Sequence, residues 1–177
     1  MTDNKWNTFN EKILVDWCDK AMCYRYLHSR SNRHYNNLNL LFTIPVIFLS
    51  TITGVANYSQ TRIPIEFQFY YNIVIGTINI LIAFIATFSQ FIKVPELNVA
   101  HKISAISWQK LSSNIKVELL KSPEEREDAY VFIKKTKEAY DVLIETSPDI
   151  KHSIVIRFNK QYKDSNFYKP EICNALI

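Results

Sequence analysis

The hydrophobic pattern divides the chain into two long apolar runs and the mixed segments around them. The runs span residues 38–58 and 67–92, with a short connection at residues 60–66, and neither contains Asp, Glu, Lys or Arg. At about 1.5 Å of rise per residue, roughly 20 apolar residues cross a hydrocarbon core of about 30 Å. We therefore expect a membrane-spanning helical hairpin. The alternative is a soluble bundle with an unusually apolar central pair of helices.

The segments around the runs place apolar residues at three- and four-residue steps, which is typical of amphipathic helices. We expect one helix over residues 6–35 that packs against the helices after the second run or against a neighbouring copy; an interfacial helix lying on the membrane is the alternative. Its buried stripe is expected to contain Ile13, Trp17, Tyr24, Leu27 and Ser31. Pro45 predicts a kink or break of the first apolar helix near residues 41–45.

Proline and capping residues predict the helices after the second run. Pro95 is expected to kink or restart the helix, which continues over residues 96–120. Ser122, Pro123 and Glu125 resemble a capping box, which predicts a further helix that ends near Glu145. Residues 146–148, Thr-Ser-Pro, predict a second stop and restart, and residues 164–177 either dock on the bundle or remain loose. The apolar positions expected inside these helices are Leu97, His101, Ala105, Trp108, Leu111, Ile115, Leu119, Ala129, Phe132, Ile133, Thr136, Tyr140, Leu143, Ile144, Ile150, Ile154, Phe158 and Tyr162.

Composition and charge refine this organisation. Only two glycines occur, both inside the apolar runs, and strand-like alternation is scarce, so the predicted fold class is an all-α integral membrane protein. The expected parts are an N-terminal amphipathic cytosolic helix (residues 1–37), a two-helix transmembrane hairpin (residues 38–94) and a C-terminal cytosolic helical region (residues 95–177). The net charge of +4 is spread over the chain and does not indicate nucleic-acid binding.

The distribution of cations predicts the orientation of the hairpin. Lys and Arg are enriched on cytoplasmic flanks, and here they flank both runs while the connection holds only Arg62. Both termini are therefore expected in the cytoplasm. Aromatic residues favour the membrane boundary, and they gather on the loop side of the runs. They are Tyr58, Phe67, Phe69, Tyr70 and Tyr71.

Polar and small residues form a stripe along the second run. Its members advance in steps of three and four and are Asn72, Gly76, Asn79, Ala83, Thr87 and Gln90. An amide at mid-membrane is costly against lipid, so Asn79 must face a partner helix or water. One hairpin cannot enclose a pore. The stripe is thus either the lining of a lumen among several copies or a sealed interface between them, with Lys93 just beyond a cytoplasmic pore mouth in the first case.

The first run carries its own polar side. Its candidate residues are Thr43, Ser50, Thr53, Gly54 and Asn57, with Asn39 before them. Ser50 and Gly54 make a small-xxx-small pair, a pattern that lets helix backbones approach closely. These residues are expected either to pack the two runs of one hairpin together or to contribute to a pore.

The sequence offers no recognisable catalytic or metal-binding motif. The four histidines are scattered, and His101 is expected to be a packed helix position, with pH sensing at a pore mouth as the alternative. Cys18, Cys23 and Cys173 lack paired metal-ligand spacing and are expected to be free buried thiols. No phosphate-binding glycine loop occurs. We therefore expect no enzymatic activity, no cofactor and no metal site.

The order of these features resembles the SLATT domain family. The likeness covers roughly residues 14–158 and is most specific in the first run, at residues 43–54 (Thr-Ile-Pro-Val-Ile-Phe-Leu-Ser-Thr-Ile-Thr-Gly). The other matching positions are Trp17, Tyr24, Tyr26, His28, His101, Trp108, Arg126 and Thr146 to Pro148. It is closest to the versions found in large DNA viruses. The resemblance implies two transmembrane helices with a cytosolic helical extension, and a membrane effector that oligomerises into a pore.

Two functions of different classes follow from the sequence. One is a homo-oligomeric pore or ion channel of cyclic symmetry, with the lipid bilayer and ions as partners. The other is a structural or assembly membrane protein, for example a component of a virion inner membrane, in which the polar stripe is sealed helix to helix.

Overall fold

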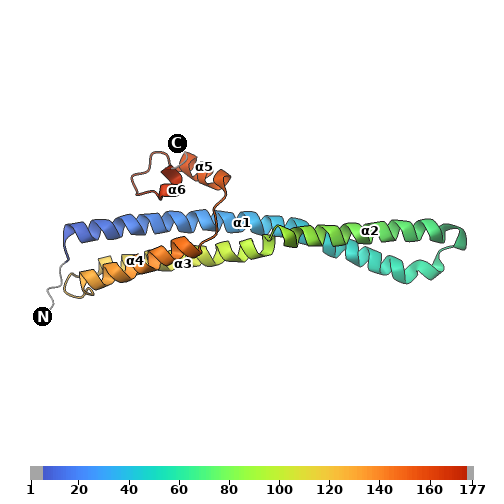
Figure 1. Cartoon of the computed structure of the whole chain (residues 1–177), viewed down its shortest axis with the longest axis horizontal. Coiled ribbons are helices and arrows are strands. Elements are labelled where there is room, and N and C mark those ends of the chain that lie inside the picture. The colour runs from blue at the N-terminus through green and yellow to red at the C-terminus, as the bar shows by residue number, and fades with distance from the viewer. Residues whose placement is uncertain (1–5, 175–177) are drawn as a thin grey trace. The chain divides into compact units, whose positions relative to one another are not determined.

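The computed structural model describes residues 6–174, and all the regular secondary structure in this range is helical, with no β-strand (Figure 1). The helices are α1 (Thr8–Ser59), the short 3-10 helix η1 (Gln60–Arg62), α2 (Ile65–Phe91), α3 (Val94–Leu120), α4 (Ala129–Thr146), α5 (His152–Gln161) and α6 (Glu171–Asn174). They form two compact units. We call residues 6–32 with 99–174 the helical bundle, and residues 33–98 the apolar hairpin.

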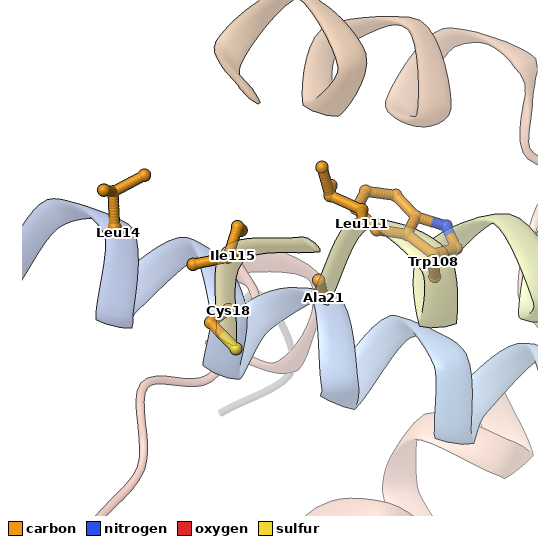
Figure 2. Packing of buried hydrophobic residues seen from close by; sticks show 6 residues of the cluster. All are labelled: Leu14, Cys18, Ala21, Trp108, Leu111 and Ile115. Atoms are coloured by element: carbon orange, nitrogen blue, oxygen red, sulfur yellow. The ribbon is translucent and has the colours of Figure 1, made fainter. Parts of the chain in front are cut away.

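The core of the helical bundle is a layer between α1 and α3. The buried side chains that meet there are Leu14, Cys18 and Ala21 of α1, and Trp108, Leu111 and Ile115 of α3 (Figure 2). Half-buried residues of α4, including Phe132, Tyr140 and Leu143, cover this layer. The expected packing of the N-terminal segment against the later helices is therefore confirmed. Of the expected buried stripe, Leu27 and Ser31 are buried, whereas Ile13, Trp17 and Tyr24 are only half-buried.

A second cluster joins α5 and the C-terminal segment to α1. Its buried members are Cys23, Leu27, Val155, Phe158 and Cys173. The half-buried ring of Phe167 lies near the rings of Phe158 and Tyr162, with centroids 6.3 and 5.8 Å apart. The segment after α5 is therefore docked and not loose, up to the last described residue; residues 175–177 lie outside the described part of the chain.

The first helix is longer than the sequence pattern indicates. Residues 6–35 and the first apolar run were expected as separate helices with a kink or break at Pro45, but α1 continues from Thr8 to Ser59 with Pro45 inside it. The expected break is therefore wrong, and the kink at Pro45 stays a prediction. A proline removes one N–H donor and its ring crowds the carbonyl of the preceding turn, but the bonds on either side continue the helix.

The predicted start of the helix after α3 is also wrong. Residues 122–128 form turns, in which the N–H of Glu125 bonds to the carbonyl of Ser122, and α4 begins only at Ala129. Its N-cap is Asp128, whose carboxylate accepts a hydrogen bond from the N–H of Val131. The predicted stop at residues 146–148 is confirmed, because α4 ends at Thr146 and α5 begins at His152. Ile144, expected inside, is exposed.

Arg126 holds the connection between α3 and α4 in this non-helical form. Its guanidinium donates to the backbone carbonyls of Lys121 and Leu119 at 3.0 and 2.9 Å and pairs with the carboxylate of Glu11. It also lies 4.9 Å from the ring centroid of Trp6. A planar fork of donors can satisfy all these groups at once, whereas the same residues in a continued helix would lose them. The connection is therefore fixed by tertiary contacts.

Replacing Arg126 by lysine is expected to destabilise the helical bundle by about 1.5–3 kcal/mol, because a lysine ammonium cannot make these divergent bonds together. Chemical denaturation of the full chain in detergent, followed by circular dichroism, measures the effect. Lys134→Arg, on the exposed surface of α4, is the control and is expected to change stability by less than about 0.5 kcal/mol. Equal stabilities of the two variants contradict the role given to Arg126.

The apolar hairpin is built from the second half of α1 and from α2, which meet along a seam of regularly spaced side chains. The seam residues are less exposed than most of their neighbours and advance in steps of three and four. They are Phe42, Val46, Leu49, Thr53 and Ala56 on α1, Tyr71, Ile75, Ile78, Ile82, Ile85 and Ser89 on α2, and Ile92 just after α2. Two contacts fix the pairing. The hydroxyl of Tyr71 donates to the carbonyl of Ala56 at 2.7 Å, and the ring centroids of Phe42 and Phe88 are 6.1 Å apart.

Both helices of the hairpin are long and apolar enough to cross a membrane. Only 6% of the most apolar window of each is buried in the structure. The core helix of a soluble protein is mostly buried, so the exposure of these windows distinguishes them from such a helix. The seam covers one side of each helix, and the other sides are left without a partner in the described chain.

Candidate polar face of the apolar hairpin

The helical register places the polar residues of the two helices on one side of the hairpin. Thr43, Ser50, Gly54 and Asn57 each follow a seam residue of α1 by one position. Asn72, Gly76, Asn79, Ala83 and Gln90 each follow a seam residue of α2 in the same way. Each step along a helix turns about 100°, and α1 and α2 run in opposite directions. In such a pair, residues one step beyond the seam point to the same side in both helices.

This polar face consists of Thr43, Ser50, Gly54, Asn57, Asn72, Gly76, Asn79, Ala83 and Gln90, and every one of them is exposed. Asn57 and Asn72 lie nearer the loop, and Ser50 and Asn79 lie near the middle of the two apolar runs. Thr87 follows the seam residue Ile85 by two positions and not by one, so it lies further round α2, at the edge of the face. Among the positions of α1 that follow a seam residue by one, between Thr43 and Asn57, Ile47 is the one large apolar side chain. The two sets of candidates, which the sequence presents separately, thus form a single surface.

Thr53 does not belong to this face. It is a buried seam residue, with its hydroxyl donating to the carbonyls of Leu49 and Ser50 at 3.0 and 3.2 Å. A hydroxyl satisfied by the preceding turn of its own helix needs no other partner. Thr53 therefore packs the two helices of one hairpin together, which is one of the two roles expected for the polar residues of the first run.

The opposite side of the hairpin carries large apolar side chains. Its exposed members are Leu41, Phe48, Ile52 and Val55 of α1, and Val74, Leu81, Phe84, Phe88 and Phe91 of α2. Thr51 and Thr77 also lie outside the seam and the polar face, and each donates its hydroxyl to the carbonyl four residues earlier at 2.8 Å. These hydroxyls are satisfied inside their own helices, so this side presents hydrocarbon.

The two glycines leave open space on the polar face. A Cβ atom added to Gly54 or Gly76 would meet nothing within 4 Å. The small-xxx-small pair of Ser50 and Gly54 therefore does not bring α1 and α2 of one hairpin together. Glycine in a helix costs about 1 kcal/mol relative to alanine, and nothing inside this hairpin requires it. The open positions can instead admit the backbone of another helix or water.

Lys93 lies in the turn between α2 and α3. Its side chain is exposed, and its N–H bonds to the carbonyl of Gln90 at 2.9 Å. The backbone of Lys93 is left-handed, with φ of 52°, which costs a residue with a side chain about 1–2 kcal/mol. The sequence predicted the restart at Pro95, but not that Lys93 would adopt the left-handed backbone conformation of the turn.

Comparisons with protein families, with characterised proteins and with solved structures gave no significant match for this chain. The functional argument therefore depends on the residues themselves.

The buried thiols do not form a reactive centre. All three cysteines are free and buried. Burial raises the pKa of Cys23 to about 12 and that of Cys173 to about 11, and it also raises the pKa of Cys18. A thiol that stays protonated at neutral pH is a poor nucleophile and a poor metal ligand. Across residues 6–174, no group of three or more His, Cys, Asp or Glu side chains is placed to hold a metal ion.

One contact of chemical interest was missed by the sequence analysis. His28 of α1 and His101 of α3, separated in sequence by the whole apolar hairpin, meet in the helical bundle with their Nδ1 atoms 2.9 Å apart. His101 was identified as part of a helical stripe and His28 only as a position of the family resemblance, and spacing along one helix does not reveal a partner on another. The other two histidines, His34 and His152, are exposed.

Proposed function

We propose that this chain is an integral membrane protein whose apolar hairpins assemble into a homo-oligomeric pore lined by the polar face. The observation that carries the proposal is the two-sidedness of the hairpin: exposed amides, hydroxyls and glycines on one side and exposed large hydrocarbon side chains on the other. In lipid, the hydrocarbon side is already in its preferred solvent. The polar side is not, because an amide without a partner costs several kcal/mol there.

Assembly around an axis resolves this conflict. One hairpin cannot surround water, but copies related by cyclic symmetry can all direct the polar face inward. The lining contains no charged side chain, since Asp, Glu, Lys and Arg are absent from both runs. Neutral amides and hydroxyls select weakly among ions, and the Lys93 side chains at the ends of α2 would add positive charge at one mouth. The flanking Lys and Arg residues favour a cytoplasmic location for both termini.

The resemblance of residues 14–158 to the SLATT family supports the same function, since that family is associated with pore-forming membrane effectors. The same surface supports a second function. If the amides of neighbouring hairpins bond to one another, the polar face is a sealed interface, and the protein has a structural or assembly role in a membrane.

Exchange of Asn79 for leucine separates the two functions. In a pore, Asn79→Leu is expected to change the single-channel conductance in a planar bilayer by about twofold or more while the oligomer remains intact, because a polar ring at mid-lumen is lost. Ile80→Leu, one residue away and outside the polar face, is the matched control and is expected to conduct like the wild type.

The structural role predicts the reverse pattern. In that case the purified wild-type protein carries no current, and Asn79→Leu weakens the assembly as measured by sedimentation in detergent. A wild-type protein that is monomeric in membranes contradicts both functions.

A further inference from the structure

His28 and His101 form a buried contact between α1, through which the chain leaves the helical bundle, and α3, through which it returns. α1 continues beyond His28 into the apolar hairpin, and α3 follows the hairpin and carries His101. The two side chains are 1% and 0% exposed, and their Nδ1 atoms are 2.9 Å apart. A contact of this length between two ring nitrogens is a hydrogen bond in which one Nδ1 donates and the other accepts.

That geometry requires both rings to be neutral, or to share a single extra proton. A first proton added to the ring that donates through Nδ1 leaves the hydrogen bond in place, but it puts a charge in a buried site. A second proton must enter at the accepting Nδ1. Two N–H groups then point at each other across the contact, and two cations lie side by side without water, so the contact cannot persist.

The described neighbours of the pair are aromatic rings, and the basic residues next to it in sequence are exposed. On α1, the ring of Tyr24 lies 6.4 Å from that of His28, and Arg25 is exposed. On α3, Lys102 beside His101 is exposed, and the stacked pair of Tyr24 and Trp108 continues the aromatic layer toward Tyr140 of α4.

Burial lowers the pKa of both rings to about 4, and His101 adds to the lowering for His28. No carboxylate among the described residues contributes to either shift.

We propose that the contact of His28 with His101 is an acid-sensitive latch, which holds α1 and α3 together while the rings are neutral and opens when both become protonated. The direction of the pH dependence follows from the linkage between proton binding and stability. A histidine that is held neutral in the folded bundle binds protons more tightly when the bundle opens. The stabilisation is complete above pH about 6.5, the usual value for an exposed histidine, and is lost progressively as the pH falls toward 4. This inference does not depend on the pore.

The direct test is the titration of the four imidazoles in the full chain, in detergent or nanodiscs, by NMR with histidine-labelled protein. We expect His28 and His101 to remain neutral to at least about one pH unit below 6.5, the usual pKa of an exposed histidine. Titration of both of these rings near 6.5 overturns the latch. This result is read from the wild type, whether or not the protein conducts ions.

A pair of double variants tests the consequence for the bundle. Near-ultraviolet circular dichroism reports the packing of Trp108 and Tyr24 between pH 8 and 4. Wild type and H34Q/H152Q, which lacks the two exposed histidines, are expected to lose this signal together in acid. H28Q/H101Q, which removes the pair, is expected to lose most of the dependence on pH in this range. An unchanged acid transition in H28Q/H101Q contradicts the proposal, and if this variant does not fold, the imidazole titration decides.

Discussion

Replacement of Trp108 by alanine is expected to destabilise the helical bundle by about 3–5 kcal/mol, the largest effect of any single side chain in this unit. Trp108 is fully buried, and its ring lies 4.6 Å from Tyr24 and 5.2 Å from Tyr140, measured between centroids. Its indole N–H donates to the hydroxyl of Ser147 at 3.1 Å. The substitution removes aromatic contacts from three helices and leaves a cavity that the surrounding residues can fill only in part.

The measurement is denaturation of the full chain in detergent, followed by the far-ultraviolet signal of the bundle helices. A domain of this size has a total stability of only about 5–15 kcal/mol, so a loss of this size is expected to leave the bundle partly unfolded at 37 °C. Phe9→Ala, on α1 and 69% exposed, is the matched aromatic control, with an expected loss below about 0.5 kcal/mol. Similar losses for the two variants contradict the assignment of Trp108 to the core.

Replacement of Gly76 by phenylalanine is expected to weaken assembly of the hairpins by at least about tenfold, which corresponds to about 1.4 kcal/mol. The first atom of the added side chain has no neighbour within 4 Å inside one hairpin, and position 76 points to the open polar face. Helix formation is not opposed, since glycine is the poorer helix former. The damage is therefore confined to whatever lies against the polar face, either a neighbouring helix or a water-filled lumen.

Leu81→Phe provides a control of the same size on the opposite, hydrocarbon side of α2. It is expected to assemble like the wild type, because the added ring enters lipid. Oligomer size for each variant is read by light scattering or native mass spectrometry in detergent, with circular dichroism to show that both hairpins remain helical. Assembly that survives Gly76→Phe but fails with Leu81→Phe would reverse the two faces and remove the basis for the proposed pore.

The helices, and the residues that end them, were largely predictable because they depend on local properties. Two patterns predict helices without any knowledge of tertiary contacts: the uncharged runs at residues 38–58 and 67–92, and the steps of three and four on α3 and α4. The restart at Pro95 is also predicted locally, from the missing N–H of proline. The prediction failed at the start of α4, where the capping sequence at Ser122 competes with the bonds of Arg126. Those bonds join segments far apart in the chain, and a local pattern cannot weigh them.

The sequence by itself determined that the fold class is all-α, that the chain holds two uncharged runs of membrane-spanning length, and that each run carries polar residues at helical spacing. Only the tertiary structure decided which side of each helix faces the other, because rotation about a helix axis is set by the seam of contacting side chains. That rotation removed Thr53 from the polar face and joined the remaining candidates into one surface. It was likewise the packing of α1 on α3, not spacing along either helix, that brought His28 to His101.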